Sequence, residues 1–181
     1  MNSDRTKWNA RYREGDIPSE ASEIVQRFFR LAPGPRALDL AAGAGRNAIF
    51  LADNGFRVDA VDISVEGLSR IRHPGVRCAC ADLDAFDIPS GGYDLIVDVL
   101  YVNRRLFPQM VEGLRPGGLL VFESLVLEPG QDAGGHCRDF FLRPNELLRA
   151  FLSLRVLHYR EGPEQGPDDG RQLASLVARR I

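Results

Sequence analysis

Two glycines, Gly43 and Gly45, stand between a short apolar run and an amphipathic segment. Glycine lets the backbone turn sharply and lets a ligand approach the main chain closely. The segment that follows is predicted to be a helix, whose first turn offers unpaired N–H groups and a partial positive charge. The two glycines therefore predict a binding site for an anionic group such as a pyrophosphate or a carboxylate.

A carboxylate, Asp62, follows at the predicted end of the next strand. In that position it can accept hydrogen bonds from both hydroxyls of a ribose. The glycine turn and this carboxylate together indicate a ligand that contains adenosine. Two cofactors fit the pattern: NAD and S-adenosylmethionine (SAM).

The NAD interpretation rests on Gly43-Ala44-Gly45-Arg46-Asn47-Ala48, which matches the G-x-G-x-x-A variant of the dinucleotide fingerprint. Asp39 opposes it, because a carboxylate just before the turn would repel a pyrophosphate and attract an ammonium group. More than a helix of chain also precedes the turn, and we expect no separate substrate domain after the fifth strand. These features favour SAM, and an NAD-dependent oxidoreductase stays the alternative.

Continuous apolar runs that alternate with amphipathic segments predict a parallel sheet covered on both faces. Right-handed crossovers then give an α/β fold with a doubly wound, mostly parallel, seven-stranded Rossmann-like sheet and a C-terminal antiparallel hairpin. Expected strands are 36–41, 57–61, 76–79, 93–99, 119–123, 154–159 and 172–178, and expected helices are 46–54, 65–71, 107–114 and 144–152.

In such a fold, ligands bind at the carboxyl ends of the strands. The conspicuous carboxylates fall there: Asp39 and Asp62 at the first two strands, Asp82 after the third and Asp98 after the fourth. Cys78 and Cys80 alternate on the third strand, so we expect both to face the core.

Length and composition predict one domain over residues 1–181, with residues 1–35 as an N-terminal helical lid or cap. The chain is 44% hydrophobic with a net charge of −2, and its arginines are interspersed with acids, which disfavours a nucleic-acid partner. We find no membrane-length apolar run and no signal peptide. Three cysteines favour a reducing, cytoplasmic location, and no spacing suggests a metal site.

Several motifs, in order, resemble those of class I SAM-dependent methyltransferases. Within that class, the chain is similar to the small tellurite-resistance-type and thiopurine-type group. The stretches that carry the resemblance are Ala37–Asn47, Val61–Ser64, Ala81–Leu83, Tyr93–Val97 and Leu114–Leu120 for the class, and Trp8–Tyr12, Gly45–Asn47 and Phe141–Leu148 for the group.

The resemblance implies a cofactor site for SAM. Gly43 and Gly45 would pass close to its methionine part, and Asp39 would lie near its ammonium group. Asp62 would take the ribose hydroxyls. The other implied contacts are Ile63, Asp82 and Leu83 around adenine, Asp98 and Val99 beside the sulfonium, and Ala41, Asn47 and Arg11.

The acceptor is expected to be a small molecule, and the implied substrate contacts are Trp8, Tyr12, His136 and Arg138. Asp98-Val99-Leu100-Tyr101 lacks the two prolines that accompany methylation of nucleic-acid amino groups. We find no convincing general base. This favours an acceptor that needs none, such as a thiol, a chalcogen anion or another soft nucleophile. A noncatalytic SAM-binding protein is a further alternative.

Overall fold

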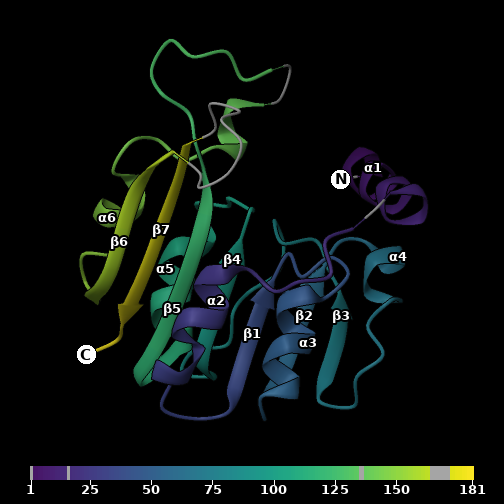
Figure 1. Ribbon diagram of the computed structural model, residues 1–181, viewed down its shortest axis with the longest axis horizontal. Helices are drawn as coiled ribbons and strands as arrows, with labels where there is room; N and C mark the ends of the chain where they lie inside the picture. The colour runs from purple at the N-terminus through teal and green to yellow at the C-terminus, as the bar shows by residue number, and fades with distance from the viewer. Residues whose placement is uncertain (1, 16, 135–136, 164–171) are drawn as a thin grey trace.

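The computed structural model describes residues 2–15, 17–134, 137–163 and 172–181. Its centre is one seven-stranded sheet in the order β3-β2-β1-β4-β5-β7-β6 (Figure 1). β1 to β5 pair in parallel, and β7 pairs antiparallel with both β5 and β6, which confirms the predicted fold class. The strands are β1 Arg36–Leu40, β2 Arg57–Asp62, β3 Val76–Cys80, β4 Tyr93–Val99, β5 Leu114–Val126, β6 Arg155–Pro163 and β7 Gln172–Arg179.

Helices cover both faces of this sheet. One apolar cluster joins α2 and α3 to one face, and the other joins α5 and α6 to the opposite face. Figure 1 shows α2 and α3 in front of the strands and α5 behind them. The helical elements are α1 Asn2–Glu14, α2 Glu23–Phe28, η1 Phe29–Leu31, α3 Arg46–Asp53, α4 Val65–Leu68, α5 Leu106–Gly113, η2 Arg138–Phe140 and α6 Glu146–Ala150.

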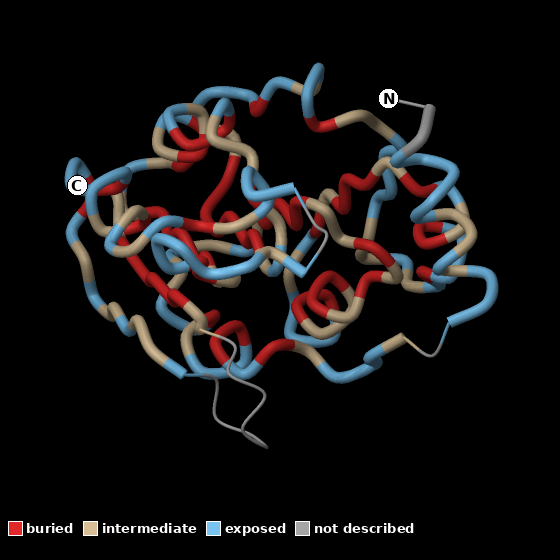
Figure 2. The backbone as a smooth tube through the Cα atoms, turned by 90° about the horizontal axis from the view of Figure 1, so that it is seen from above, coloured by how far each residue is buried: buried red, intermediate tan, exposed pale blue. Residues whose placement is uncertain are grey.

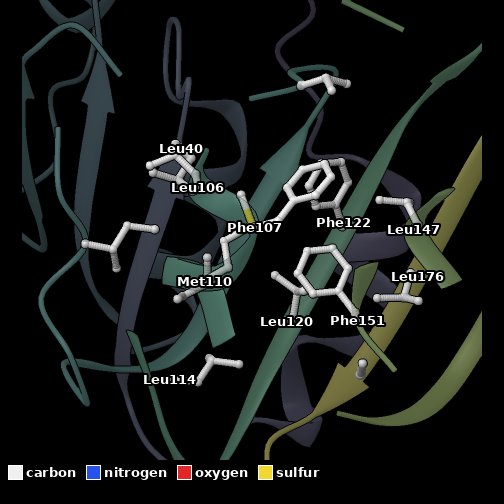
Figure 3. Packing of buried hydrophobic residues seen from close by; sticks show 14 of the residues in the cluster. Leu40, Leu106, Phe107, Met110, Leu114, Leu120, Phe122, Leu147, Phe151 and Leu176 are labelled. Carbon is white, nitrogen blue, oxygen red and sulfur yellow. The ribbon is translucent and has the colours of Figure 1, made fainter. Parts of the chain in front are cut away.

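The core is packed around aromatic rings between the sheet and its covering helices. Phe107, Phe122 and Phe151 come from α5, β5 and the residue after α6, and their ring centroids lie 5.3 to 6.0 Å apart (Figure 3). Each such ring removes a large apolar area from water. Buried residues gather toward the middle of the molecule (Figure 2), so the parallel strands form a rigid support for the loops at their ends.

Several element boundaries differ from those predicted, and the beginnings of β5 and α6 show why. The expected turn Arg115-Pro116-Gly117-Gly118 lies inside β5, which begins at Leu114 and pairs with Tyr93 before a register shift. α6 begins at Glu146, because Asn145 has a left-handed φ of 60° and leaves Pro144 outside the helix.

The expectation that Cys78 and Cys80 lie in the core is wrong, because both side chains are exposed. β3 is the outermost strand on its side of the sheet, so it pairs only with β2. Alternation along a strand shows which residues share a face, but it does not show whether that face is covered.

Strand order reverses at β1, which lies between β2 and β4. In open α/β sheets, this switch point is where the loops after adjacent strands diverge and leave room for a ligand. The glycine turn follows β1, so the fold places it at this position. Among the described helices, none is long and apolar enough to cross a membrane.

Candidate functional site

The turn after β1 depends on left-handed backbone conformations. Gly43 and Gly45 have φ values of 57° and 82°, and Ala41, which has a side chain, has a φ of 51°. The N–H of Gly45 donates to the carbonyl of Ala42 at 2.8 Å, and α3 then starts at Arg46. A Cβ on Gly45 would stand 2.5 Å from Cγ1 of Ile71. Both glycines are therefore required by the shape of the turn.

Asp62, at the end of β2, is tied to this turn. One carboxylate oxygen accepts from the N–H of Gly43 at 2.8 Å, and the other accepts from the N–H of Ser64 at 2.7 Å. Burial raises the pKa of Asp62, and these backbone donors oppose the rise. A carboxylate oxygen has more than one lone pair, so Asp62 can still accept hydrogen bonds from ligand hydroxyls.

Asp39, on β1, is buried beside the turn. Its Oδ2 has no hydrogen-bond partner among the described residues. Burial raises the pKa of Asp39 to about 7, while the N–H of Ala48 and the charge of Arg46 hold it lower than burial alone would. A buried carboxyl group without a partner is costly, so this position is complementary to a cation or a hydrogen-bond donor.

Asp98, on β4, is the second such group. It pairs in register with Leu40 of β1, and neither of its carboxyl oxygens has a partner within the described chain. Burial, followed by the nearby Asp39, raises its pKa well above the ordinary range. Asp98 lies on the same sheet face as Leu40 and Ile96, whereas Asp39 faces α3. The two acids therefore flank the switch point from opposite faces.

The predicted adenine residues lie at the ends of β2 and β3. Asp82 is half-buried, and its Oδ1 accepts from the N–H of Asp84 at 3.0 Å, so its carboxylate also stabilises the loop. Leu83 is buried in the core cluster that contains Leu40. Ile63 is half-buried. The structure thus brings these residues close to the predicted site but gives Leu83 a packing role as well.

Asn47 and Arg11 differ in their surroundings. Asn47 is buried, and its Oδ1 accepts from the N–H of Ser22 at 2.9 Å, which anchors the segment between α1 and α2. Arg11 is exposed on α1, where its guanidinium lies 5.5 Å from the centroid of the Trp8 ring. Asn47 therefore supports the site from within, and Arg11 borders it from outside.

Helix α1 lies over the glycine turn. The Tyr12 hydroxyl fills the space beside Gly43, and burial together with Asp62 raises the pKa of Tyr12 to about 12. Asn9 was not predicted to matter, yet its Oδ1 accepts from the Ser64 hydroxyl at 2.7 Å, and that hydroxyl caps α4. The capping position of Ser64 was visible in the sequence, but its partner on α1 was not.

The loop after β4 carries an expected residue, Leu100, and an ion pair that was not predicted. Leu100 has a φ of 62°, and its N–H donates to the carbonyl of Glu123 at 2.8 Å. Farther along the same loop, Arg104 forms a two-point ion pair with Glu146, at 2.6 and 2.8 Å. The pair joins segments that are far apart in the sequence, so no local pattern predicts it.

Of the two substrate contacts expected on the segment after β5, Arg138 and His136, only Arg138 is described by the structure. The Arg138 guanidinium donates to the carbonyls of Gln131 at 2.7 Å and Glu128 at 3.4 Å, so it holds its own loop. His136 lies outside the described residues. Within the described ranges, no group of three or more His, Cys, Asp or Glu residues could hold a metal ion.

Known proteins resemble the chain in sequence and in fold. Residues 37–118 match a family described as a methyltransferase domain. The chain is 30% identical over 105 residues to demethylmenaquinone methyltransferase from Beutenbergia cavernae, covering 54% of this chain and 43% of that protein. TehB from Haemophilus influenzae superposes with a TM-score of 0.72 at 21% identity, covering 98% of this chain and 67% of TehB.

An S-adenosylmethionine dependent methyltransferase from Mesorhizobium loti superposes with a TM-score of 0.68 at 21% identity, covering 86% of this chain and 95% of that chain. The alignment with the curated B. cavernae relative spans less than half of that protein's length. These matches agree with the predicted resemblance to methyltransferases and with SAM as the predicted cofactor. Residues 37–118 thus match a methyltransferase-domain family, and the chain shares its fold with TehB and with a solved S-adenosylmethionine dependent methyltransferase.

Proposed function

We propose that the chain transfers a methyl group from SAM to a small-molecule acceptor. The observation that carries this proposal is the buried carboxyl group of Asp39 next to the glycine turn, whose Oδ2 has no hydrogen-bond partner within the described residues. SAM carries an ammonium group and a sulfonium, so a site with unpartnered acids suits it, whereas the pyrophosphate of NAD would be repelled. The match to a methyltransferase domain supports the same conclusion.

The residues present fit SAM. Gly43 has no side chain where a ligand must approach, and Asp39 and Asp98 have carboxyl oxygens without partners in the described structure. We assign Asp39 to the ammonium group and Asp62 to the ribose hydroxyls. The further proposed contacts are Ile63, Asp82 and Leu83 for adenine, Asp98 and Val99 beside the sulfonium, and Ala41, Asn47 and Arg11 around the methionine part.

Helix α1 is proposed as a lid within the N-terminal segment 1–35 of a single domain. Because the Tyr12 hydroxyl lies against Gly43, the side chain must shift when a ligand enters the turn. Trp8 stands 6.2 Å from Tyr12 by ring centroids, so the two rings lie side by side on α1.

Bound SAM would supply a methyl group already activated by its sulfonium. The work left to the chain is alignment of the acceptor and exclusion of water, and such positioning can contribute on the order of 7–11 kcal/mol. Thiols, chalcogen anions and other soft nucleophiles need no strong base, which defines the proposed acceptor range. The three free cysteines are consistent with a cytoplasmic location, which we include in the proposal.

Calorimetry with SAM, S-adenosylhomocysteine and NAD tests this proposal. SAM should bind, and Asp39→Ala should weaken its binding more than tenfold, because the ammonium group loses its counter-charge. Asp53→Ala is the matched control, since Asp53 is exposed at the end of α3. Tighter binding of NAD than of SAM would instead support the oxidoreductase, and SAM binding without turnover of any acceptor would support a noncatalytic role.

A further inference from the structure

The residues that follow the carboxyl end of β4 have a distinct chemical character. We infer that the acceptor is a largely apolar small molecule that lies against Leu100 and Phe140, that it carries no charged group apart from its reacting atom, and that it is not an oxyanion. This inference rests on the proposed methyl transfer and narrows it, because the proposed range still includes chalcogen anions.

Leu100 presents an apolar side chain at the carboxyl edge of the sheet. It follows Asp98 and Val99 at the end of β4 and is 56% exposed. A left-handed φ of 62° is unfavourable for leucine, and the hydrogen bond from its N–H to Glu123 fixes it there. The backbone thus holds an apolar group in an exposed position next to the switch point, where the fold places a ligand.

Phe140 and Leu100 together form the apolar surface that we call the acceptor wall. The carbonyls of Asp139 and Phe141, on either side of it, both accept from the Arg104 guanidinium at 2.8 Å. Arg104 lies in the loop that begins with Leu100, so Phe140 is carried next to that loop with 52% of its surface exposed. Figure 1 shows that the segment after β5 extends beyond the same edge of the sheet as α1.

Three arginines near Leu100 and Phe140 are already engaged by other groups. Arg104 is bound to Glu146 and two carbonyls, Arg138 to two carbonyls, and Arg105 to Asp87 and the carbonyl of Leu83. Arg143 lies near Glu146 and helps to lower its pKa. An oxyanion acceptor would therefore have to compete with these partners for the donors of Arg104, Arg105 and Arg138.

The acids at this edge point to the same class of acceptor. Asp98 is fully buried without a partner among the described residues, and the Glu123 carboxylate accepts from the Ser175 hydroxyl at 2.5 Å. The Glu123 carboxylate repels an anion, and the Asp98 carboxyl group can accept a hydrogen bond from a thiol or hydroxyl of the acceptor. In the transfer, the nucleophile bonds to the methyl carbon, the carbon–sulfur electrons return to sulfur, and the nucleophile's proton passes to water.

A matched acceptor series tests the inference through release of S-adenosylhomocysteine. Benzenethiol should have a kcat/KM at least tenfold higher than 4-mercaptobenzoate, and selenite and tellurite should give no turnover. Faster turnover of 4-mercaptobenzoate, selenite or tellurite than of benzenethiol would overturn the inference. SAM binding without any turnover of benzenethiol would also overturn it. A protein that binds no SAM would instead contradict the proposed function itself.

Variants at Phe140 locate the acceptor. Phe140→Ala should raise KM for benzenethiol at least fivefold and leave the dissociation constant of SAM unchanged, and Phe140→Leu should restore most of the loss. Phe140→Arg should raise kcat/KM for 4-mercaptobenzoate relative to that for benzenethiol, because it adds a cation to the acceptor wall. Leu152→Ala is the control, since Leu152 is 70% exposed just after α6. An unchanged KM in Phe140→Ala contradicts the placement.

Discussion

The Tyr12 hydroxyl occupies the space that a Cβ on Gly43 would need. The ring of Tyr12 also lies 3.0 Å from the position of a Cβ on Gly67, and the carbonyl oxygen of Gly43 lies 2.9 Å from that same position. The glycine turn, α4 and α1 are therefore fitted to one another through positions that lack side chains. A substitution in any one of these three elements should therefore disturb the packing of the other two.

Gly43→Ala should abolish detectable SAM binding, because the new methyl group meets Tyr12 in the space proposed for the cofactor. Gly55→Ala is a matched control: its φ of 89° is also left-handed, but nothing within the described chain lies within 4 Å of an added Cβ. Both changes should cost about 1–2 kcal/mol of unfolding free energy from the backbone conformation. Denaturant unfolding and calorimetry separate the two effects, and equal SAM affinities in the two variants would contradict the assignment.

Asn9→Ala should loosen α1, since it removes the acceptor of the Ser64 hydroxyl. We expect SAM to dissociate at least threefold faster and trypsin to cut sooner after Lys7, with a loss of about 1 kcal/mol of stability. Arg13→Ala serves as the comparison, because it removes only the exposed ion pair of Arg13 with Glu66. Stopped-flow measurements that give the same dissociation rate for both variants would argue against the lid.

SAM affinity should depend on pH through Asp39. With a pKa of about 7, this group must lose a proton before it can offset the charge of an ammonium group. Binding should therefore be at least tenfold weaker at pH 5.5 than at pH 7.5, with net proton release at the lower pH. Calorimetry in two buffers of different ionisation enthalpy measures that release, and a pH-independent affinity would count against Asp39.

The free energy of unfolding should also depend on protonation of Asp39, but it should fall as pH rises, whereas SAM affinity increases. The folded pKa of Asp39, about 7, lies above its ordinary 3.8, so the folded state binds the proton more tightly and loses stability as pH rises from about 4 to 7. Asp39→Asn should therefore be more stable than the unaltered chain at pH 8, by on the order of 3–4 kcal/mol, and nearly equal to it at pH 4. Thermal unfolding at both values tests this, and equal differences at the two would contradict it.

Glu146→Gln should destabilise the wall that carries Phe140. It leaves the half-buried guanidinium of Arg104 without its charged partner, at an expected cost of about 1–3 kcal/mol. Asp87→Asn is the control, because its ion pair with Arg105 is largely exposed and should contribute little. Denaturant unfolding gives the two costs, and similar values would mean that the Arg104–Glu146 pair is no stronger than a surface pair.

Local sequence patterns were enough to predict the supports of the site. The apolar run of β4 and the glycine turn after β1 predicted the two strands and the position of Asp39 on β1, because these depend on residues next to one another. Contacts between distant segments were not predictable: Asn9 reaches Ser64, and Arg104 reaches Glu146, only once the chain has folded. The error at Cys78 and Cys80 has a similar cause, because the covering of a strand is decided by the whole sheet.

The chain has a single tryptophan, Trp8, and it lies on α1. The ring is partly exposed, with the ammonium of Lys7 5.9 Å and the guanidinium of Arg11 5.5 Å from its centroid. Its fluorescence therefore reports on α1 alone, without an introduced dye. The emission wavelength and quenching of this one fluorophore give a direct optical record of whether the helix stays on the glycine turn.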